Sequence, residues 1–524
     1  MPRASDSNSG ATSLTGRTAT GVAWGAGGAL VYQFFGLAVQ TALTYLLTKA
    51  QYGAYAKTFA LLTFAMLLQQ VGFNEILLRR QKRLRLWRTT VFWFALTLGA
   101  AGTLILLAAS LPLGILYSDP DLTQLLLLVA AVPLIRSLLV LPSLDLIEAM
   151  RFRLHYGLML VNAVTTSSAT LLLALLGLGA KSFVLAMLVA EPLYVAIMWR
   201  VAGTGIAGGL RPSRWLPLAR DFRLVWGSNA ARWVRSSIDP LVLGLFASQS
   251  VVGLYFFAQS MLNQIFRVVT LNLSGVLLPA LNRLSADPQR QTAAFLRAAR
   301  VLTLIGAPLC IGLGAIGSLF VRVFLDADKW KDLPPVLAVL GAGMVFRLLD
   351  EPMQSLISAQ GRFRVGFRLS VGTGSLYVVF CLLGSASRTA LGVALAAGAY
   401  YCIVGPTMLT VAIRVGGGRL ADAVRVFAIP FLLATAAIAP WLLADLLIPG
   451  HGRSRDAAVL ASIVMGSCLT YLALGRVVRP DGWQELISRI QDFSPGRLRP
   501  LLGMLAGSAP DPSPLPVAPH AQQR

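Results

Sequence analysis

The chain has 524 residues, of which 56% are hydrophobic and only 13% are charged. A soluble chain carries about a quarter charged residues, so this composition excludes an ordinary soluble protein and indicates a polytopic membrane protein. The net charge of +23 would suggest nucleic-acid binding in a soluble protein. In a membrane protein, the positions of the charges along the chain determine whether this interpretation applies.

The chain opens with a tail at 1–16 that is rich in Ser, Thr and Gly and is predicted to be disordered. About fourteen apolar segments follow that are long enough to cross a bilayer at roughly 20 residues per crossing. The N-terminal sequence shows no short apolar block followed by a small-residue cleavage site, so we expect the first span to act as an uncleaved signal anchor. Very short linkers at 178–182 and 385–389 make twelve spans the alternative count. The predicted spans are 21–47, 54–78, 89–116, 122–147, 157–178, 182–201, 224–247, 251–281, 299–325, 334–359, 367–385, 389–413, 426–447 and 457–475.

The loops between these spans alternate in charge. Basic loops include RRQKRLRLWR at 79–88, MRFRLHYG at 150–157 and GRFRVGFR at 361–368, whereas intervening loops such as YSDPD at 117–121 are poor in cations. Because cationic loops stay in the cytoplasm, we expect a multi-pass protein of the bacterial inner membrane with both termini cytoplasmic. This topology and anionic lipid explain the basic loops, so no nucleic-acid partner is expected.

Three pairs of sequence features recur in the same order in the two halves of the chain. AQYGAYAKTFALL (50–62) matches SVVGLYFFAQSML (250–262), SDPD (118–121) matches LDAD (325–328), and Arg-Phe-Arg at 151–153 matches that at 362–364. Parallel repeats of this kind are known in transporters. We therefore predict an all-α polytopic membrane protein with two parallel-repeat six-helix bundles around a central cavity and two extra C-terminal helices.

The predicted organisation follows from the spans, the repeat and the tails. DGWQELISRIQDF has apolar residues at helical spacing, which is typical of an amphipathic helix on the membrane surface. The predicted parts are a cytoplasmic tail at 1–16, an N-terminal bundle at 17–201, a basic cytoplasmic linker at 202–223, a C-terminal bundle at 224–413, two further spans at 414–480, the surface helix at 481–493 and a disordered Pro-rich tail at 494–524.

Charged residues lie inside several predicted spans. A charge at the bilayer centre costs at least about 2.5–3.5 kcal/mol, so these groups should face the protein interior or water. Arg232, Arg235 and Asp239 share one face of the seventh span, and Pro240 should kink that helix. The other charges are Arg136, Arg267, Arg347, Asp350 and Glu351, with Lys57 near the outer end of the second span.

Two interpretations of these charges remain open. Lys57 could extend to the membrane surface, and several charges could form structural pairs along one helix, namely Arg235–Asp239, Arg347–Asp350 and Arg347–Glu351. Arg232 and Arg267, in contrast, have no acidic neighbour on their own helix. Cations left over after pairing favour an anionic substrate.

Uncharged polar residues also interrupt the apolar spans. Gln259, Asn263 and Arg267 are spaced by four and form a stripe along the eighth span, and Gln33 lies in the first. Amides beside a guanidinium suit a sugar phosphate, because amides bond hydroxyls and a guanidinium forks onto phosphate oxygens. The alternative is hydrogen bonding between helices. The three histidines have no ligand-spaced partner, so no metal is expected.

At these residues the chain resembles the polysaccharide (O-antigen type) flippase branch of the multidrug/oligosaccharidyl-lipid/polysaccharide exporter superfamily. The resemblance covers nearly all of residues 18–480. It rests on the first hairpin, LLTKAQYGAYAKTFALLTFAMLLQQVGFNEILLRR, on the seventh span with its hairpin, IDPLVLGLFASQSVVGLYFFAQSM, and on LPALNRLSAD and SLISAQGRFR. Asp239, Gly244, Gly253, Tyr255 and Ala258 occupy the family's motif positions in the second of these segments.

The chain departs from the family pattern in the first hairpin. Gln70 and Val71 precede Gly72 where the family often has an acidic residue, and Thr48-Lys49 stands where an Arg is usual. If those groups help couple transport to an ion gradient, the departure puts coupling by them in doubt.

The resemblance implies a transporter, and not an enzyme, that flips a polyprenyl-pyrophosphate-linked oligosaccharide from the cytoplasmic to the outer leaflet by alternating access. The product would be an exopolysaccharide, O-antigen or capsule. Implied partners are the lipid-linked substrate, membrane lipids, and polymerase and glycosyltransferases of the same pathway; no cofactor is implied, and an ion gradient of unspecified identity is the candidate driving force. The residues expected to bind substrate are Gln33, Lys57, Arg232, Arg235, Asp239, Gln259, Asn263, Arg267, Arg347 and Asp350.

Two other classes of protein compete with this interpretation. A multidrug/cation antiporter of the same superfamily would need unpaired acids and few arginines, whereas cations predominate at depth here. A membrane glycosyltransferase or polysaccharide polymerase or ligase would need a sizeable outer loop or an acid catalyst, and the outer loops are short. The Asp-x-Asp at 326–328 resembles a metal–nucleotide motif, but it is expected in an outer loop, where nucleotide sugars are absent.

Overall fold

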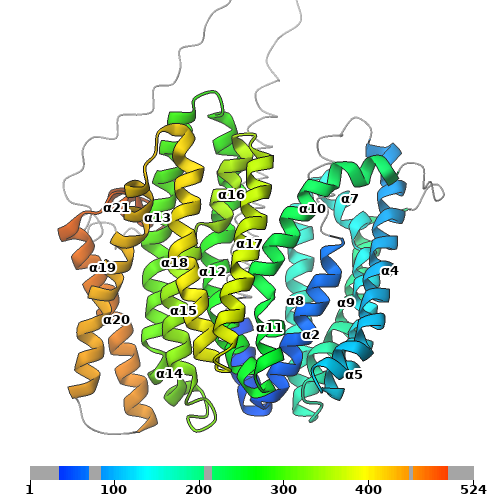
Figure 1. Ribbon diagram of the computed structural model, residues 1–524, viewed down its shortest axis with the longest axis horizontal. Helices are drawn as coiled ribbons and strands as arrows, with labels where there is room; N and C mark the ends of the chain where they lie inside the picture. Colours follow the sequence, from blue (N-terminus) through cyan, green and yellow to red (C-terminus); the bar gives the residue numbers. More distant parts are fainter. Residues whose placement is uncertain (1–32, 34, 70–83, 206–214, 448–451, 494–524) are drawn as a thin grey trace, which may run out of the picture.

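The computed structural model of the protein describes residues 33, 35–69, 84–205, 215–447 and 452–493. These residues form helices joined by short turns, and no strand occurs among them (Figure 1). The helices up to residue 202 are Phe35–Leu46, α2 (Lys49–Leu67), α4 (Leu84–Leu116), α5 (Pro120–Val129), α6 (Ala131–Ser137), α7 (Val140–Glu148), α8 (Phe152–Leu175) and α9 (Lys181–Ala202).

The second half of the chain is also helical in the residues that the structure describes. Its helices are α10 (Trp215–Ser237), α11 (Asp239–Phe246), α12 (Gln249–Arg283), α13 (Pro288–Ala315), α14 (Gly317–Phe324), α15 (Leu333–Arg347), α16 (Asp350–Ala359), α17 (Phe363–Ser385), α18 (Ala390–Ile413), a 3-10 turn at Arg414–Gly416, α19 (Leu420–Leu447), α20 (Arg453–Val478) and α21 (Trp483–Phe493).

The lengths and composition of these helices confirm an all-α polytopic membrane protein. Ten spans among the described residues are long and apolar enough to cross a membrane. The helix Phe35–Leu46, α2, α10 with α11, and α12 fall outside that set, so the count of fourteen spans and the boundaries of the two bundles stay predictions. The predicted tails at 1–16 and 494–524 lie outside the described residues.

Four of the predicted spans are broken among the described residues, and three of the breaks carry charged residues; the fourth break, in the ninth span, lies at Ile316 between α13 and α14. The fourth span consists of α5, α6 and α7, with Arg136 in the short middle helix. The seventh is divided at Ile238, so that α11 begins at Asp239 with Pro240 in its first turn; the predicted kink is confirmed. The tenth span ends one helix at Arg347 and begins the next at Asp350. Irregular backbone at membrane depth is tolerated where it lines a cavity or is buried in protein.

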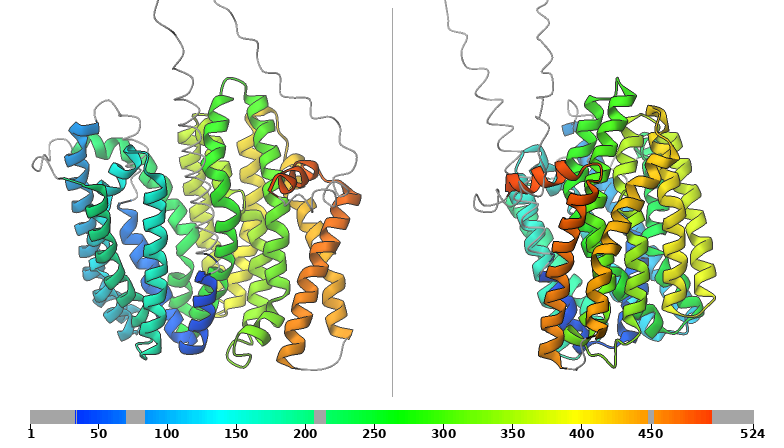
Figure 2. Two further views of the ribbon diagram at one scale, coloured as in Figure 1. Left: turned by 180° about the vertical axis from the view of Figure 1, so that it is seen from behind. Right: turned by 90° about the vertical axis from the view of Figure 1, so that its left-hand side faces the viewer.

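Two large hydrophobic clusters lie among the described helices. One includes buried residues of α2, α4, α5 and α9, such as Leu62, Leu106 and Val184. The larger one runs through α12, α13, α15 and α18, with Phe257, Leu337 and Leu409. Figure 2 shows α21 lying crosswise to the long helices, next to the end of α20; its place on the membrane surface stays a prediction. Asp481, just before α21, pairs with Arg300 of α13 at 3.2 Å.

The two halves of the chain are in contact at one end of the bundle. Lys329, in the turn before α15, donates to the carbonyl oxygens of Thr44 (2.6 Å) and Leu47 at the end of the first helix. In the matching place of the other half, the Tyr117 hydroxyl donates to the Leu241 carbonyl of α11 at 2.9 Å. Each half thus donates hydrogen bonds to the other, and this end is called the hairpin end below.

Candidate functional site

A cavity of about 710 Å³ lies between the two halves. Its wall combines aromatic rings with amides, hydroxyls and charged groups from the first helix, α2, α6, α8, α9, α10, α11, α12 and α15. Five of the predicted substrate-binding residues line it, namely Gln33, Gln259, Asn263, Arg267 and Arg347. The other five, Lys57, Arg232, Arg235, Asp239 and Asp350, do not.

The polar stripe of α12 lies on the cavity wall as its spacing predicted. Gln259, Asn263 and Arg267 all line the cavity. The Arg267 side chain is exposed, and no hydrogen bond or ion pair joins it to any other residue that the structure describes. A guanidinium at membrane depth with five N–H donors and no protein acceptor is available to an anion.

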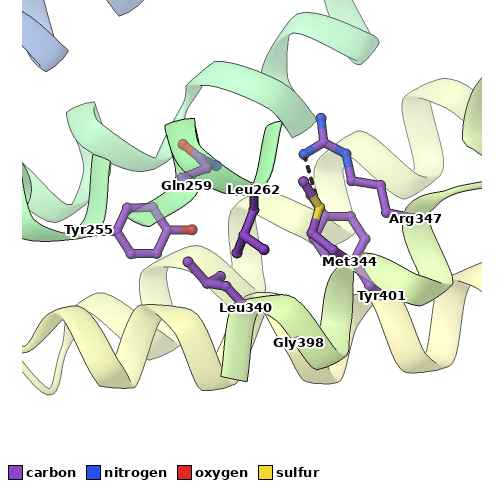
Figure 3. A pocket seen from close by; sticks show the side chains of 8 residues that line it. All are labelled: Tyr255, Gln259, Leu262, Leu340, Met344, Arg347, Gly398 and Tyr401. Carbon is purple, nitrogen blue, oxygen red and sulfur yellow. Dashed lines mark hydrogen bonds between the residues drawn. The ribbon is translucent and has the colours of Figure 1, made fainter. Parts of the chain in front are cut away.

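Arg347 is held beside this stripe by side chains of α12 and α18. Its Nη1 donates to Asn263 Oδ1 at 3.2 Å, and its guanidinium lies 5.1 Å from the Phe266 ring and 5.6 Å from the Tyr401 ring. Figure 3 shows Arg347 with Met344 and Tyr401 around a small side cavity opposite Tyr255 and Gln259. The alternative pairing of Arg347 with the carboxylates that follow it in sequence is therefore wrong.

Asp239 is fully buried beside the same stripe. Its Oδ2 accepts hydrogen bonds from Gln259 Nε2 at 2.7 Å and from the Tyr255 hydroxyl at 3.1 Å. Its Oδ1 has no partner among the described residues. Asp239 therefore orients Gln259 rather than lining the cavity itself.

Arg235 does not pair with Asp239, so that alternative is also wrong. Arg235 donates to Thr373 Oγ1 at 3.1 Å and to the Ser370 carbonyl at 3.3 Å on α17. It lines a second, much smaller cavity together with Asp350 and Tyr401. These two charged residues of the predicted site thus lie together, behind the main cavity.

Arg232 has a carboxylate partner that its own helix does not reveal. It pairs with Glu351 of α16 at 3.0 Å and also donates to Asn229 Oδ1 at 3.2 Å. The two side chains of the pair are 45% and 37% exposed, and exposed pairs contribute little to stability. The expectation that Arg232 is a cation left without a carboxylate is therefore wrong.

Lys57 is buried, so the alternative in which it extends to the membrane surface is wrong. Its Nζ lies 2.7 Å from Asp119 Oδ2, and the side chains are 2% and 1% exposed. Tyr117 covers the ammonium with its ring centroid 4.9 Å away. Asp119 also caps α5 by accepting from the Leu122 amide at 3.1 Å, so the pair ties α2 to the start of α5.

The predicted site left out two charged members of the cavity wall: Arg136, which was placed inside the fourth span, and Glu191, which was not singled out. Arg136 of α6 donates through Nη2 to Glu191 Oε1 of α9, and both residues line the cavity. The signal in the sequence was a single carboxylate in the middle of the sixth span, directly before Pro192. Arg136, Arg267 and Arg347 together outnumber Glu191, so the charged residues of the cavity wall are mainly cationic.

Aromatic residues form a further part of the wall. Tyr55 of α2 stacks on Phe183 of α9 with ring centroids 3.9 Å apart, and Phe256 of α12 meets Tyr55 edge to face at 5.8 Å. All three line the cavity. Tyr55 belongs to the Gly-x-Tyr repeat, but the sequence alone did not indicate that its ring faces the cavity.

A polytopic helical protein whose broken spans enclose a polar cavity between two halves is a membrane transporter. A sequence profile described as "polysaccharide biosynthesis protein" matches residues 42–335. The chain belongs to this family, which confirms the resemblance to the polysaccharide branch of the exporter superfamily.

Similar proteins include one named for lipopolysaccharide biosynthesis and one named for succinoglycan transport. The chain is 23% identical over 400 residues to the lipopolysaccharide biosynthesis protein WzxC of Escherichia coli, covering 73% of this chain and 78% of that one. It is 26% identical over 315 residues to the succinoglycan biosynthesis transport protein ExoT of Rhizobium meliloti, covering 58% and 62%.

Solved structures share the fold at low sequence identity. The lipid II flippase MurJ in an inward closed conformation has a TM-score of 0.67 at 12% identity, over 86% of this chain and 98% of that chain. A mutant of the Vibrio cholerae MATE transporter VcmN has a TM-score of 0.55 at 16% identity, over 80% and 99%. With its apolar spans, the chain is a multi-pass bacterial membrane protein of the transporter class rather than an enzyme.

Proposed function

We propose that the protein moves an oligosaccharide linked to polyprenyl pyrophosphate from the cytoplasmic to the outer leaflet, by alternating access, for polysaccharide biosynthesis. The observation that carries the proposal is Arg267, whose exposed guanidinium lines the cavity without a protein partner among the described residues. A diphosphate loses its water shell on entering the membrane region, and charge-assisted hydrogen bonds from guanidinium groups replace it. Arg347 adds a second cation on the same wall.

The uncharged part of the cavity supports a sugar as the cargo's head group. Gln33 Nε2 and Asn162 Oδ1 are buried without a hydrogen-bond partner in the described part of the chain, and both residues line the cavity. A buried polar atom without a partner is costly, and sugar hydroxyls both donate and accept. Thr166 and Ser167 of α8 add hydroxyl groups to this wall.

The charge of the loops supports an orientation of the protein in the membrane. The hairpin end belongs to loops poor in cations, so we place it at the outer face, with both termini in the cytoplasm of the bacterial inner membrane. The sugar and diphosphate would occupy the cavity while the polyprenyl chain stays in the bilayer. Glycosyltransferases would supply this cargo and a polymerase would consume it, and an ion gradient is the candidate driving force.

A multidrug/cation antiporter is the second candidate, because VcmN shares the fold. Its cargo would be a cation, which the arginines of this cavity would repel. The cavity wall carries one carboxylate among the described residues, Glu191, and that carboxylate is already paired with Arg136. The charge of the wall therefore favours the anionic cargo.

The test is export by variants in a strain from which the chromosomal gene has been deleted. The deletion strain should accumulate lipid-linked repeat units on the inner leaflet, and the intact gene should clear them. Arg267→Ala should clear the lipid-linked repeat units at least about tenfold more slowly, since hydrogen bonds to charged groups contribute about 1.5–3 kcal/mol. Arg290→Ala, at an 81% exposed arginine outside the cavity, is the matched control. Normal clearance by Arg267→Ala, or drug sensitivity without accumulation, would overturn the proposal.

A further inference from the structure

The Arg136–Glu191 pair lies on the opposite half of the cavity from Arg267 and Arg347. Arg136 belongs to α6, the short helix between two breaks, and Glu191 lies in the middle of α9. The arginine side chain is 38% exposed, whereas that of Glu191 is 2% exposed. The pair thus presents its cation to the cavity and keeps its carboxylate behind it.

The hydrogen bonding of this pair is incomplete. Arg136 Nη2 donates to Glu191 Oε1, but Arg136 Nε and Glu191 Oε2 are both buried with no hydrogen-bond partner in the described part of the chain. A guanidinium and a carboxylate commonly form two parallel hydrogen bonds. A buried pair offsets its desolvation only when the remaining donors and acceptors are satisfied, so this pair is held less firmly than its burial suggests.

The surroundings of Glu191 leave Arg136 as its ionic partner. Around the pair, the Met66 sulfur of α2 lies 3.9 Å from Arg136 Nη1, and Tyr194 is one turn further along α9. The face that α8 presents to the cavity contributes an amide and hydroxyls at Asn162, Thr166 and Ser167. Asp145 on α7 is bound to Arg88. Removal of Arg136 from the pair would leave a buried carboxylate without a cation.

We propose that Glu191 is an internal counter-anion that occupies Arg136 while the cavity is empty and is displaced by the diphosphate of the cargo. This inference rests on the proposed function, because it needs an anion in the cavity. On displacement, the N–H···O bond from Arg136 to Glu191 breaks and one to a phosphate oxygen forms. The freed carboxylate, which lines the cavity but is only 2% exposed, takes up one proton from the cavity water, because a buried charge without a partner is strongly disfavoured.

The exchange gives the transporter a way to release a highly charged cargo. Three unopposed arginines would bind a diphosphate too tightly to let it leave. A carboxylate tethered beside one of them competes with the cargo, and re-formation of the pair returns the proton to water. Glu191 therefore lowers the affinity for the anion, and the affinity of the intact protein should fall as the pH rises.

The experiment is calorimetric titration of the purified full-length protein with inorganic pyrophosphate in two buffers of different ionisation heat. The intact protein should take up about one proton more per bound pyrophosphate than the Glu191→Gln variant does. Because pyrophosphate itself gains or loses the same number of protons in both cases, the difference reports on Glu191. Glu191→Gln should also bind about tenfold tighter, since it loses a charged competitor. Equal proton uptake, or equal or weaker binding by Glu191→Gln, would overturn the inference.

Two further arms separate this inference from the proposed function. Arg267→Ala should lose pyrophosphate binding; if the intact protein does not bind, or Arg267→Ala binds equally well, the anion site and the inference both fail. On the unmodified protein, the infrared difference spectrum should gain the band of a protonated carboxyl group when pyrophosphate is added. Binding without that band contradicts the exchange alone, and it does so even if Glu191→Gln does not fold.

Discussion

Gly53 of α2 and Gly253 of α12 meet backbone to backbone, and they are the matching glycines of the two Gly-x-Tyr segments. A Cβ atom on Gly253 would lie 2.8 Å from the Gly53 nitrogen, and one on Gly53 would lie 2.8 Å from the carbonyl carbon of Gln249. Neither position has room for a side chain. The repeat seen in the sequence is therefore also a contact surface, through which the two halves touch at the hairpin end.

Replacement of Gly253 by alanine should loosen this contact. The methyl group meets backbone that cannot turn away, and overpacking of this kind costs about 1–3 kcal/mol. We expect a lower midpoint of thermal unfolding and reduced export. Gly372→Ala on α17, where no atom lies within 4 Å of the added carbon, should leave both unchanged or slightly raise stability; equal behaviour of the two variants would contradict the close contact.

The hydrogen bonds that Lys329 and Tyr117 donate across the halves at the hairpin end should help to hold the halves together. Burial raises the pKa of Tyr117 to about 12, so its hydroxyl stays a donor to Leu241 at physiological pH. Tyr117→Phe and Lys329→Met should each lose about 1 kcal/mol and speed hydrogen exchange in the first turns of α2 and α12. Unaltered exchange in both variants would show that the bonds do not hold the halves together.

Disruption of the buried Lys57–Asp119 pair should be strongly destabilising. Removal of one member leaves an uncompensated buried charge, which costs about 3–5 kcal/mol. Lys57→Met and Asp119→Leu should therefore each lower the unfolding midpoint more than the double variant does, because the double variant buries no charge. A double-mutant cycle measured by thermal unfolding gives the coupling, and purely additive effects would argue against the pair.

Replacement of Arg232 should affect export much less than replacement of Arg267, although both residues are cations inside predicted spans. Arg232→Ala removes an exposed ion pair with Glu351, which contributes at most about 1 kcal/mol, and most export should remain. The exchanged pair Arg232→Glu with Glu351→Arg should restore whatever is lost. If Arg232→Ala abolishes export as completely as Arg267→Ala, then Arg232 contacts the cargo in some state of the cycle.

The parts of the site that sequence predicted are those set by the period of one helix. Gln259, Asn263 and Arg267 line the cavity together because residues four apart share a helical face. The kink before Pro240 likewise follows from local backbone chemistry. The fold class was predictable for the same reason, since apolar length and the order of the repeat are properties of the chain itself.

The ion pairs were not predictable, because their partners lie on other helices. Arg232 pairs with a carboxylate 119 positions away, and Lys57 with one 62 positions away. The sequence offered nearer carboxylates for Arg235 and Arg347, and helical spacing favoured them. The structure instead satisfies these two arginines with a carbonyl and a hydroxyl of α17 and with the amide of Asn263.

The interrupted spans also have a mechanical consequence. Arg136, Asp239, Arg347 and Asp350 all lie within two residues of a place where one helix stops and another begins. A small change in the angle between two such helices would move Arg136 or Arg347 within the cavity that they line, while the rest of each helix moves little. Reorientation of the charges and rocking of the halves can therefore be a single movement, and stiffening a joint should slow transport without weakening the grip on the cargo.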